Sequence, residues 1–190
     1  MIALHARSGD AATGLAHARR AFGDGPDIVA LQAARPCNPL QSNLRTVPHY
    51  AGFTWYLGDH PSRPEAASFG DALAQLDAFV RDLTAPFVLA GQEQGAVLAV
   101  TLALHAPRGL AGVYACGGAI PAIDGWQLPR TDLEQLEFVF TQLDPAMYRE
   151  TALTLEERGV TVRDGDALDA GAMTGWLQSR LVAHQVASRA

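Results

Sequence analysis

The sequence predicts a three-layer α/β/α fold with a mostly parallel central sheet of about six strands. Short apolar runs alternate along the chain with stretches of helical periodicity, the order that parallel strands and crossover helices produce. The apolar runs are continuous, as expected for strands buried on both faces. A length of 190 residues suits one domain, and no linker divides residues 1–190.

The first elements are predicted from residues 1–31. Ile2 to His5 is a short apolar run and forms the first strand, and Ser8-Gly9-Asp10 is a turn and helix cap. Ala11 to Phe22 has apolar residues on one helical face, and the Gly/Pro-rich residues 23–26 end this helix. Ile28 to Leu31 is the next strand. These elements form a strand–helix–strand unit.

A long irregular segment separates the first unit from the middle of the chain. Arg35 to Glu65 contains five prolines and the pair Trp55-Tyr56, and such a long loop in a compact domain is usually functional. His49 and His60 lie in this loop, from which a side chain can reach a pocket, although loop histidines are more often exposed. The apolar spacing between Phe69 and Leu83 predicts an amphipathic helix.

The remaining elements alternate regularly. Strands are expected at Phe87–Ala90, Leu110–Cys116, Leu136–Thr141 and Val160–Val162. Helices are expected from Ala96 to about His105, from Pro145 to Arg158 and from Ala172 to about Ala187. Asp144 before Pro145 is a common helix start. We therefore expect six strands in all.

Composition excludes several classes of protein. All 14 basic residues are arginines, they are scattered, and the net charge is −6, which disfavours nucleic-acid binding. The longest apolar run, Ala96 to Leu104, is about half as long as a membrane span requires. Two cysteines exclude a disulfide scaffold, and no signal peptide precedes the first strand. We expect a cytoplasmic protein without metal or cofactor, and a homodimer is compatible with this.

The most informative segment is residues 87–100, in which a buried strand leads into a helix through Gly91-Gln-Glu-Gln-Gly95. This is the layout of a nucleophile elbow, whose central residue is strained and whose flanking glycines relieve crowding. Both glycines are present, but the central residue is Glu93 and not serine. The pattern therefore predicts the elbow without its usual nucleophile.

With these residues, the chain resembles the phospholipase/carboxylesterase family of α/β-hydrolases, the esterase and acyl-thioesterase group. Residues 5–10 look like the family's His-Gly-x-Gly-Gly-Asp turn, with Ala6 and Ser8 in place of glycines. Trp55-Tyr56 resembles the family's Trp-Phe/Tyr pair. Residues 112–121 resemble the strand and loop after the elbow helix. The resemblance implies an α/β-hydrolase fold, with a reduced sheet because the first central strand begins at Ile2.

The same resemblance places the family's catalytic positions. Residues 140–145 look like the His-Gly-x-x-Asp-Pro segment, so Asp144 stands at the triad aspartate, while the His-Gly is absent. The triad histidine should lie within residues 163–171, which contain Asp164, Asp166 and Asp169 but no histidine. The backbone N–H groups of Arg7 and Gln94 stand at the oxyanion-hole positions. His5 matches a histidine that is structural in the family.

Several roles remain open for these residues. Glu93 is a general acid/base, a covalent nucleophile, or a relic whose carboxylate binds amides at the helix start. Asp144 is a functional acid or a helix cap. Cys116 is a pocket thiol or a buried packing residue. Trp55 and Tyr56 line the pocket or plug it.

Ester hydrolysis by this fold needs a hydroxyl, a histidine and an orienting acid, and the first two are absent. We therefore predict a carboxylesterase-like homologue without normal serine-esterase turnover that binds a small ligand or partner. The alternative is altered chemistry of the lyase, isomerase or cyclase kind through Glu93. A third hypothesis is weak hydrolysis through Cys116 or another histidine.

Overall fold

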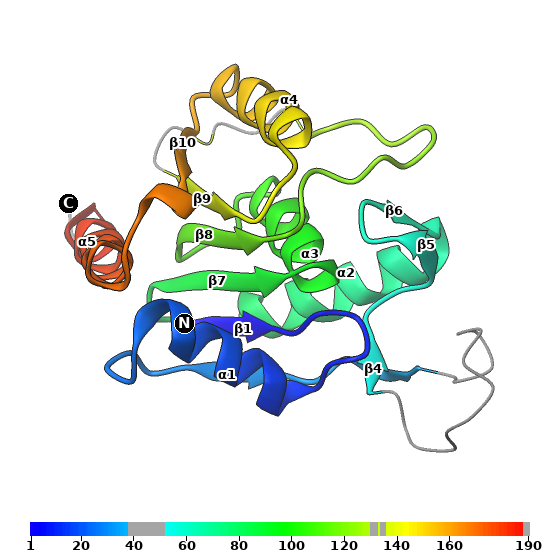
Figure 1. The fold of residues 1–190 in the computed structure, drawn as a ribbon, viewed down its shortest axis with the longest axis horizontal. Coiled ribbons are helices and arrows are strands. Elements are labelled where there is room, and N and C mark those ends of the chain that lie inside the picture. Colours follow the sequence, from blue (N-terminus) through cyan, green and yellow to red (C-terminus); the bar gives the residue numbers. More distant parts are fainter. Residues whose placement is uncertain (38–51, 130–132, 134–135, 188–190) are drawn as a thin grey trace.

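The computed structural model describes residues 1–37, 52–129, 133 and 136–187. Six parallel strands form one sheet in the order β10-β9-β8-β7-β1-β2, which confirms the predicted three-layer α/β fold (Figure 1). The strands are β1 Ile2–Leu4, β2 Val29–Leu31, β7 Phe87–Gln92, β8 Leu110–Cys116, β9 Glu137–Thr141 and β10 Thr161–Asp164.

Within the described residues, five α-helices cover the sheet: α1 Ala11–Phe22, α2 Ala66–Arg81, α3 Gln94–Ala103, α4 Pro145–Glu156 and α5 Ala170–Ala187. On one face, Phe22 of α1 and Trp176 of α5 pack with Val88, Tyr114 and other strand residues. On the other face, a larger core combines α2, α3 and α4 with Leu4, Leu89 and further strand residues. The carboxyl ends of all six strands therefore meet at one edge, to the right in Figure 1.

α3 begins earlier than expected. It begins at Gln94, directly after the elbow, and not at Ala96, and all ten of its residues are buried. A helix that is apolar on every side has no amphipathic periodicity to mark its start.

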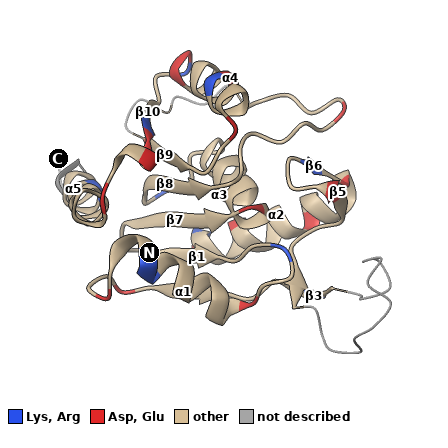
Figure 2. Ribbon diagram, in the orientation of Figure 1, with Lys and Arg blue, Asp and Glu red and all other residues tan. Residues whose placement is uncertain are grey.

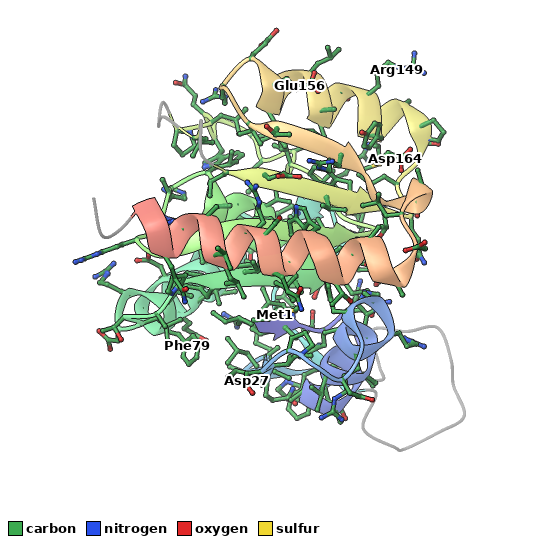
Figure 3. All side chains as sticks on the ribbon, turned by 90° about the vertical axis from the view of Figure 1, so that its left-hand side faces the viewer. Met1, Asp27, Phe79, Arg149, Glu156 and Asp164 are labelled. Atoms are coloured by element: carbon green, nitrogen blue, oxygen red, sulfur yellow. The ribbon has the colours of Figure 1, made fainter. Side chains whose placement is uncertain are left out.

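The N-terminus is held beside the edge strand β2. The Met1 ammonium donates to Asp27 O at 2.8 Å (Figure 3).

The long segment predicted as irregular contains four short strands within its described part. β3 (Arg35–Pro36) pairs with β4 (Phe53–Thr54), and β5 (Gly58–His60) pairs with β6 (Arg63–Pro64) in a hairpin. His49 lies outside the described residues. The β5–β6 hairpin, residues 58–64, stands at the carboxyl edge of the sheet and forms a wall of the site described below.

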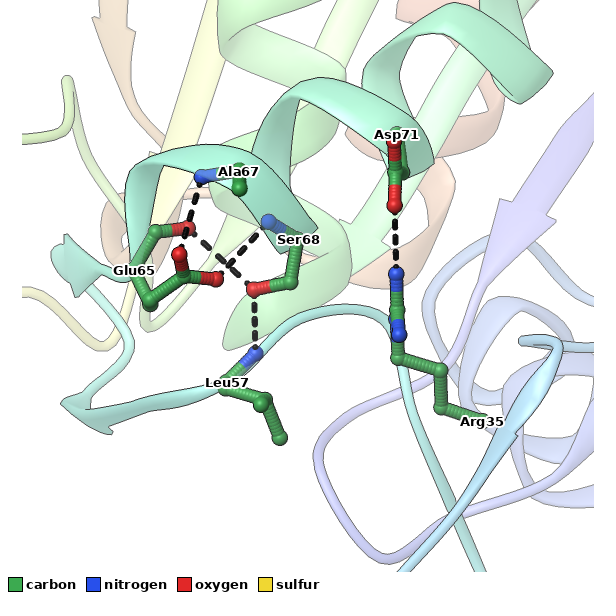
Figure 4. A network of polar contacts seen from close by, with 6 residues as sticks. All are labelled: Arg35, Leu57, Glu65, Ala67, Ser68 and Asp71. Carbon is green, nitrogen blue, oxygen red and sulfur yellow. Dashed lines mark hydrogen bonds and ion pairs between the residues drawn. The ribbon is translucent and has the colours of Figure 1, made fainter.

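A polar network holds the segment that carries the hairpin (Figure 4). Glu65 caps α2 by accepting from Ala67 N at 3.1 Å and Ser68 N at 2.8 Å, so α2 begins before Phe69. The Ser68 hydroxyl accepts from Leu57 N at 3.0 Å, and Arg35 pairs with Asp71 at 2.7 Å. These contacts fix both ends of the hairpin against α2.

Charged residues are spread over the molecule. Figure 2 shows arginines and acidic residues on several helices and strands, with no single element collecting them. No helix in the described ranges is long and apolar enough to cross a membrane.

Candidate functional site

The turn between β7 and α3 has the strained geometry of an elbow. Glu93 has φ 49° and ψ −110°, a left-handed conformation that costs a residue with a Cβ about 1–3 kcal/mol. A Cβ on Gly91 would lie 2.3 Å from Gly95 O, and one on Gly95 would lie 2.5 Å from Leu4 O. Both glycines are therefore required by backbone crowding, as the sequence pattern predicted.

The Glu93 side chain is exposed at the carboxyl edge of the sheet and makes no capping hydrogen bond to α3. This contradicts the interpretation of Glu93 as a relic bound to amides at the helix start. The carboxylate also does not lie sealed beneath Trp55 and Tyr56. Burial, and secondarily the negative charge of Glu93, raise the pKa of Tyr56. The elbow thus holds an accessible carboxylate where a hydrolase of this fold would hold its nucleophile.

Gln94, the residue after the elbow, has a buried side chain that ties the loop before the hairpin to α3. Its Oε1 accepts from Trp55 N at 3.1 Å and lies 2.8 Å from Thr54 Oγ1, and its Nε2 donates to Tyr56 O at 3.0 Å. The sequence placed only the backbone of Gln94 in the site. No sequence signal marks this side chain, because its partners are about 40 residues away.

Trp55 and Tyr56 are both buried in the larger core. The Trp55 indole donates to His5 O at 2.9 Å, and the Tyr56 hydroxyl donates to Pro61 O at 2.7 Å. Neither residue lines the cavity described below. Their burial and hydrogen bonds favour the alternative in which they plug the site and support its wall.

The loop carrying Arg7 runs beside the start of α3. A Cβ on Gly95 would lie 2.5 Å from Leu4 O and 2.8 Å from His5 O, so the end of β1 and the helix start are in close contact. The Arg7 side chain reaches the hairpin and donates to Gly58 O at 3.1 Å. The N–H groups of the first helical turn have no intrahelical acceptor. The oxyanion-hole role of the Arg7 and Gln94 amides stays a prediction.

Asp144 caps a helix. Its Oδ1 accepts from Ala146 N at 2.9 Å and from Met147 N at 3.4 Å at the start of α4, and the residue is exposed. The structure therefore supports the capping alternative.

Cys116 is 1% exposed and packs in the core on the α1/α5 face of the sheet. Burial raises the pKa of its thiol, so the thiolate form is disfavoured. It is not among the residues that line the cavity described below. The packing alternative explains this residue.

The acidic residues that replace the expected histidine segment bind backbone amides. Asp166 accepts from Gln142 N at 3.0 and 3.1 Å, Asp164 accepts from Asp166 N at 3.0 Å, and Asp169 accepts from Ala172 N at 2.8 Å. They hold the loops after β9 and β10, and residues 163–171 contain no histidine.

His5 is structural, as the resemblance implied. It is fully buried, its Nδ1 lies 2.7 Å from Ala6 O, and its Nε2 accepts from Ala33 N at 3.1 Å. These partners define the neutral tautomer with hydrogen on Nδ1. Burial lowers the pKa of His5 below its ordinary value of 6.5. Burial likewise lowers the pKa of His17, and the nearby Arg20 adds to this effect.

We expect the free energy of unfolding to fall as the pH is lowered from about 7.5 to about 5.5. The folded chain resists protonation of His5 and His17, whereas the unfolded chain takes up both protons below 6.5, so acid favours unfolding. The Met1 ammonium, whose pKa burial also lowers, acts in the same direction below 8. Urea midpoints across this range measure the loss.

A His17→Gln variant removes one of these groups and serves as the control for this pH effect. It should lose less stability over the same pH interval than the unmodified chain. An equal loss in both proteins would contradict the assignment to buried histidines. The interval stays above about pH 5, because Asp10 and Glu65 have a lowered pKa and lose their stabilising contribution at more acidic pH.

A cavity of about 840 Å³ opens at the carboxyl edge of the sheet. Three segments form it: the β5–β6 hairpin, the loop after β8, and one face of α4. Its lining residues are Asp59, His60, Ser62, Arg63, Ala119, Ile120, Pro121, Ala122, Leu128, Met147, Glu150, Thr151 and Thr154. The hairpin is joined to the loop because Ala122 N donates to Ser62 O at 2.8 Å.

The cavity lies close to the elbow, because the loop that follows β8 passes both. A Cβ on Gly117 would lie 3.8 Å from Glu93 Cγ, and one on Gly118 would lie 2.6 Å from Glu93 O; Ala119 is the next residue and lines the cavity. Sequence reasoning noted His60 only as a loop histidine and missed Arg63 and Glu150. Among the described residues, no group of three or more His, Cys, Asp or Glu side chains is arranged to hold a metal ion.

Comparisons with known proteins reveal relatives in structure alone. No protein-family model matches the chain, and no curated protein matches it in sequence. Solved structures do match: a carboxylesterase from Mesorhizobium loti (TM-score 0.68, 21% identity, 93% of this chain and 87% of that one) and the Bacillus cereus carboxylesterase (0.66, 15%, 95% and 86%). Arabidopsis thaliana SOBER1 matches with a TM-score of 0.66 and 17% identity over 95% of this chain and 98% of that one. The chain thus has the α/β-hydrolase fold of these carboxylesterases.

Proposed function

We propose that this chain is a pseudoenzyme of the carboxylesterase type, which binds a small ligand in the cavity beside its elbow and does not hydrolyse esters by a serine triad. The observation that carries the proposal is Glu93 at the centre of a sterically intact elbow. A carboxylate there replaces the hydroxyl that attacks the ester.

The candidate residues of the described ranges do not restore a nucleophile and base. Cys116 is buried on the other side of the sheet, and both ring nitrogens of His5 are engaged with the backbone. His60 accepts from Ser62 N at 3.1 Å through Nδ1. Triad members act as a unit, so loss of two of them leaves at most the residual rate that binding and the oxyanion hole supply.

A Glu93→Ser variant tests this proposal directly. We expect it to stay unlabelled by a fluorophosphonate probe and to hydrolyse p-nitrophenyl acetate no faster than the unmodified chain, because a serine without a histidine keeps its proton. Rapid hydrolysis by the unmodified chain that Glu93→Gln abolishes would overturn it. Labelling of the unmodified chain would reveal another nucleophile.

A second function, acid–base catalysis of the lyase, isomerase or cyclase kind, is favoured by one observation. The Glu93 carboxylate is exposed and makes no capping hydrogen bond, so it is available to a bound substrate. This alternative requires that Glu93→Gln retain ligand affinity and lose turnover. It fails if Glu93→Ala leaves every activity and affinity unchanged.

A further inference from the structure

The residues that line the cavity carry charges of both signs, with Arg63 and Asp59 on the hairpin and Glu150 on α4. His60 and Arg63 are paired residues of the β5–β6 hairpin, and directly opposed residues of an antiparallel pair place their side chains on the same face. Glu150 belongs to the opposing wall, where α4 also contributes Met147 and Thr154. Spacings of three and four residues put these side chains on one helix face. The cavity is therefore bordered by a hairpin wall and an α4 wall of different chemistry.

The hairpin wall offers hydrogen-bond donors. Ser62 N donates to Nδ1 of His60 at 3.1 Å, so the neutral ring carries its hydrogen on Nε2 and presents a donor there. Arg63 contributes a guanidinium group that suits a carboxylate. Within the described part of the chain, Arg63 has no carboxylate within ion-pair distance.

The α4 wall offers the acceptor. Glu150 also has no ion-pair partner among the described residues, so it does not neutralise Arg63 across the cavity. Asp59 lines the hairpin side as well, which leaves the cavity without a positive excess. Arg63, Asp59 and Glu150 are exposed, so each is available to a ligand. A simple anion would contact only Arg63 favourably, and a simple cation would contact only the carboxylates favourably.

The surface between the walls is apolar. Ile120 and Pro121 from the loop after β8, together with Leu128, line the cavity between the charged groups. A volume of about 840 Å³ lies in the range of small-molecule sites and admits a ligand larger than a single amino acid. The lining thus matches a ligand with two opposite charges and an apolar body.

We propose that this cavity binds a zwitterion with an apolar body, of the class of free dipeptides. The carboxylate meets His60 and Arg63, the ammonium meets Glu150, and the side chains cover the apolar surface. The inference rests on the proposed binding function and adds the chemical class of its ligand. It requires no reaction at Glu93.

Four dileucine peptides test the inference by calorimetric titration: the free peptide, its N-acetyl form, its C-terminal amide, and the peptide blocked at both ends. We expect the free peptide to bind about tenfold more tightly than either singly blocked form, since each block removes one charge-assisted contact. Arg63→Gln should abolish the preference for a free carboxylate and keep that for a free amine. Glu150→Gln should do the reverse.

Arg108→Gln is the matched control, because Arg108 is an exposed arginine that lines a separate depression and not this cavity. It should leave all four affinities unchanged, and a loss equal to that of Arg63→Gln would overturn the inference. Equal binding of the free and doubly blocked peptides would also overturn it, while ligand binding as such would stand. If no peptide binds, the inference fails, and the proposed function is then decided by the Glu93→Ser experiment.

Discussion

Replacing Gly95 by alanine is expected to destabilise the fold by about 3 kcal/mol or more. The added Cβ would lie 2.5 Å from Leu4 O, 2.7 Å from Leu4 C and 2.8 Å from His5 O. These are backbone atoms of Leu4, the last residue of β1, and of His5, which follows it; β1 is paired on both sides, so these atoms cannot move away as a flexible side chain would. Gly91→Ala should act similarly, with contacts of 2.3 and 2.4 Å to the backbone of residues 95 and 96.

The measurement is the free energy of unfolding by urea, or the yield of folded protein where the loss exceeds total stability. Gly70→Ala provides the control: Gly70 lies in α2, is exposed, and has nothing within 4 Å of an added Cβ. Alanine there should stabilise by about 0.5–1 kcal/mol, because it favours the helix. Similar stabilities for Gly95→Ala and Gly70→Ala would refute the close approach of α3 to β1.

Gln94→Ala is expected to lower the free energy of unfolding by about 2–4 kcal/mol and to loosen the support of the cavity wall. The truncation leaves Trp55 N without the acceptor that the Gln94 side chain supplies at 3.1 Å, and it removes the Gln94 donor at 3.0 Å from Tyr56 O, which keeps the Thr54 hydroxyl at 2.8 Å. Both groups are buried, so water does not replace those partners without rearrangement. The elbow backbone itself does not depend on this side chain.

Gln92→Ala is the matched control for this substitution. Gln92 is the same residue type on the other side of Glu93, it is half-buried, and none of its side-chain atoms takes part in a hydrogen bond within the described residues. Gln92→Ala should lower the free energy of unfolding by less than about 1 kcal/mol. Amide exchange should accelerate at Trp55 and Leu57 in Gln94→Ala alone. Unchanged exchange at these amides would exclude the proposed role of Gln94.

Features that depend on neighbouring residues were predictable from the sequence. The glycine spacing around Glu93 predicted the elbow, because the Gly-x-x-x-Gly pattern is local and the crowding at Gly91 arises within the turn, whereas Gly95 is crowded by the distant residues Leu4 and His5. Asp144 before Pro145 predicted the cap of α4 for the same local reason. The continuous apolar runs predicted the six parallel strands, because burial on both faces leaves no room for polar residues.

Features that depend on distant contacts were not predictable. The start of α3 was missed because a helix buried on every side has no polar face to mark it. Cys116 was assigned to the pocket although it faces the other layer, since a continuous apolar strand gives no sign of which side chains point where. The side-chain contacts of Gln94 span about 40 residues and leave no local pattern.

The sequence by itself determined the layers, the elbow and the presence of glutamate, not serine, at its centre. These features were predictable because apolar periodicity and glycine spacing are patterns of residues close together in the sequence. Only the tertiary structure decided that Glu93 is exposed, that Trp55 and Tyr56 are packed behind the site, and that His60, Arg63 and Glu150 border one cavity. Those three residues come together because α2, Arg7 and the loop after β8 hold the hairpin in place. These contacts join residues far apart in the sequence, so no local pattern predicts them.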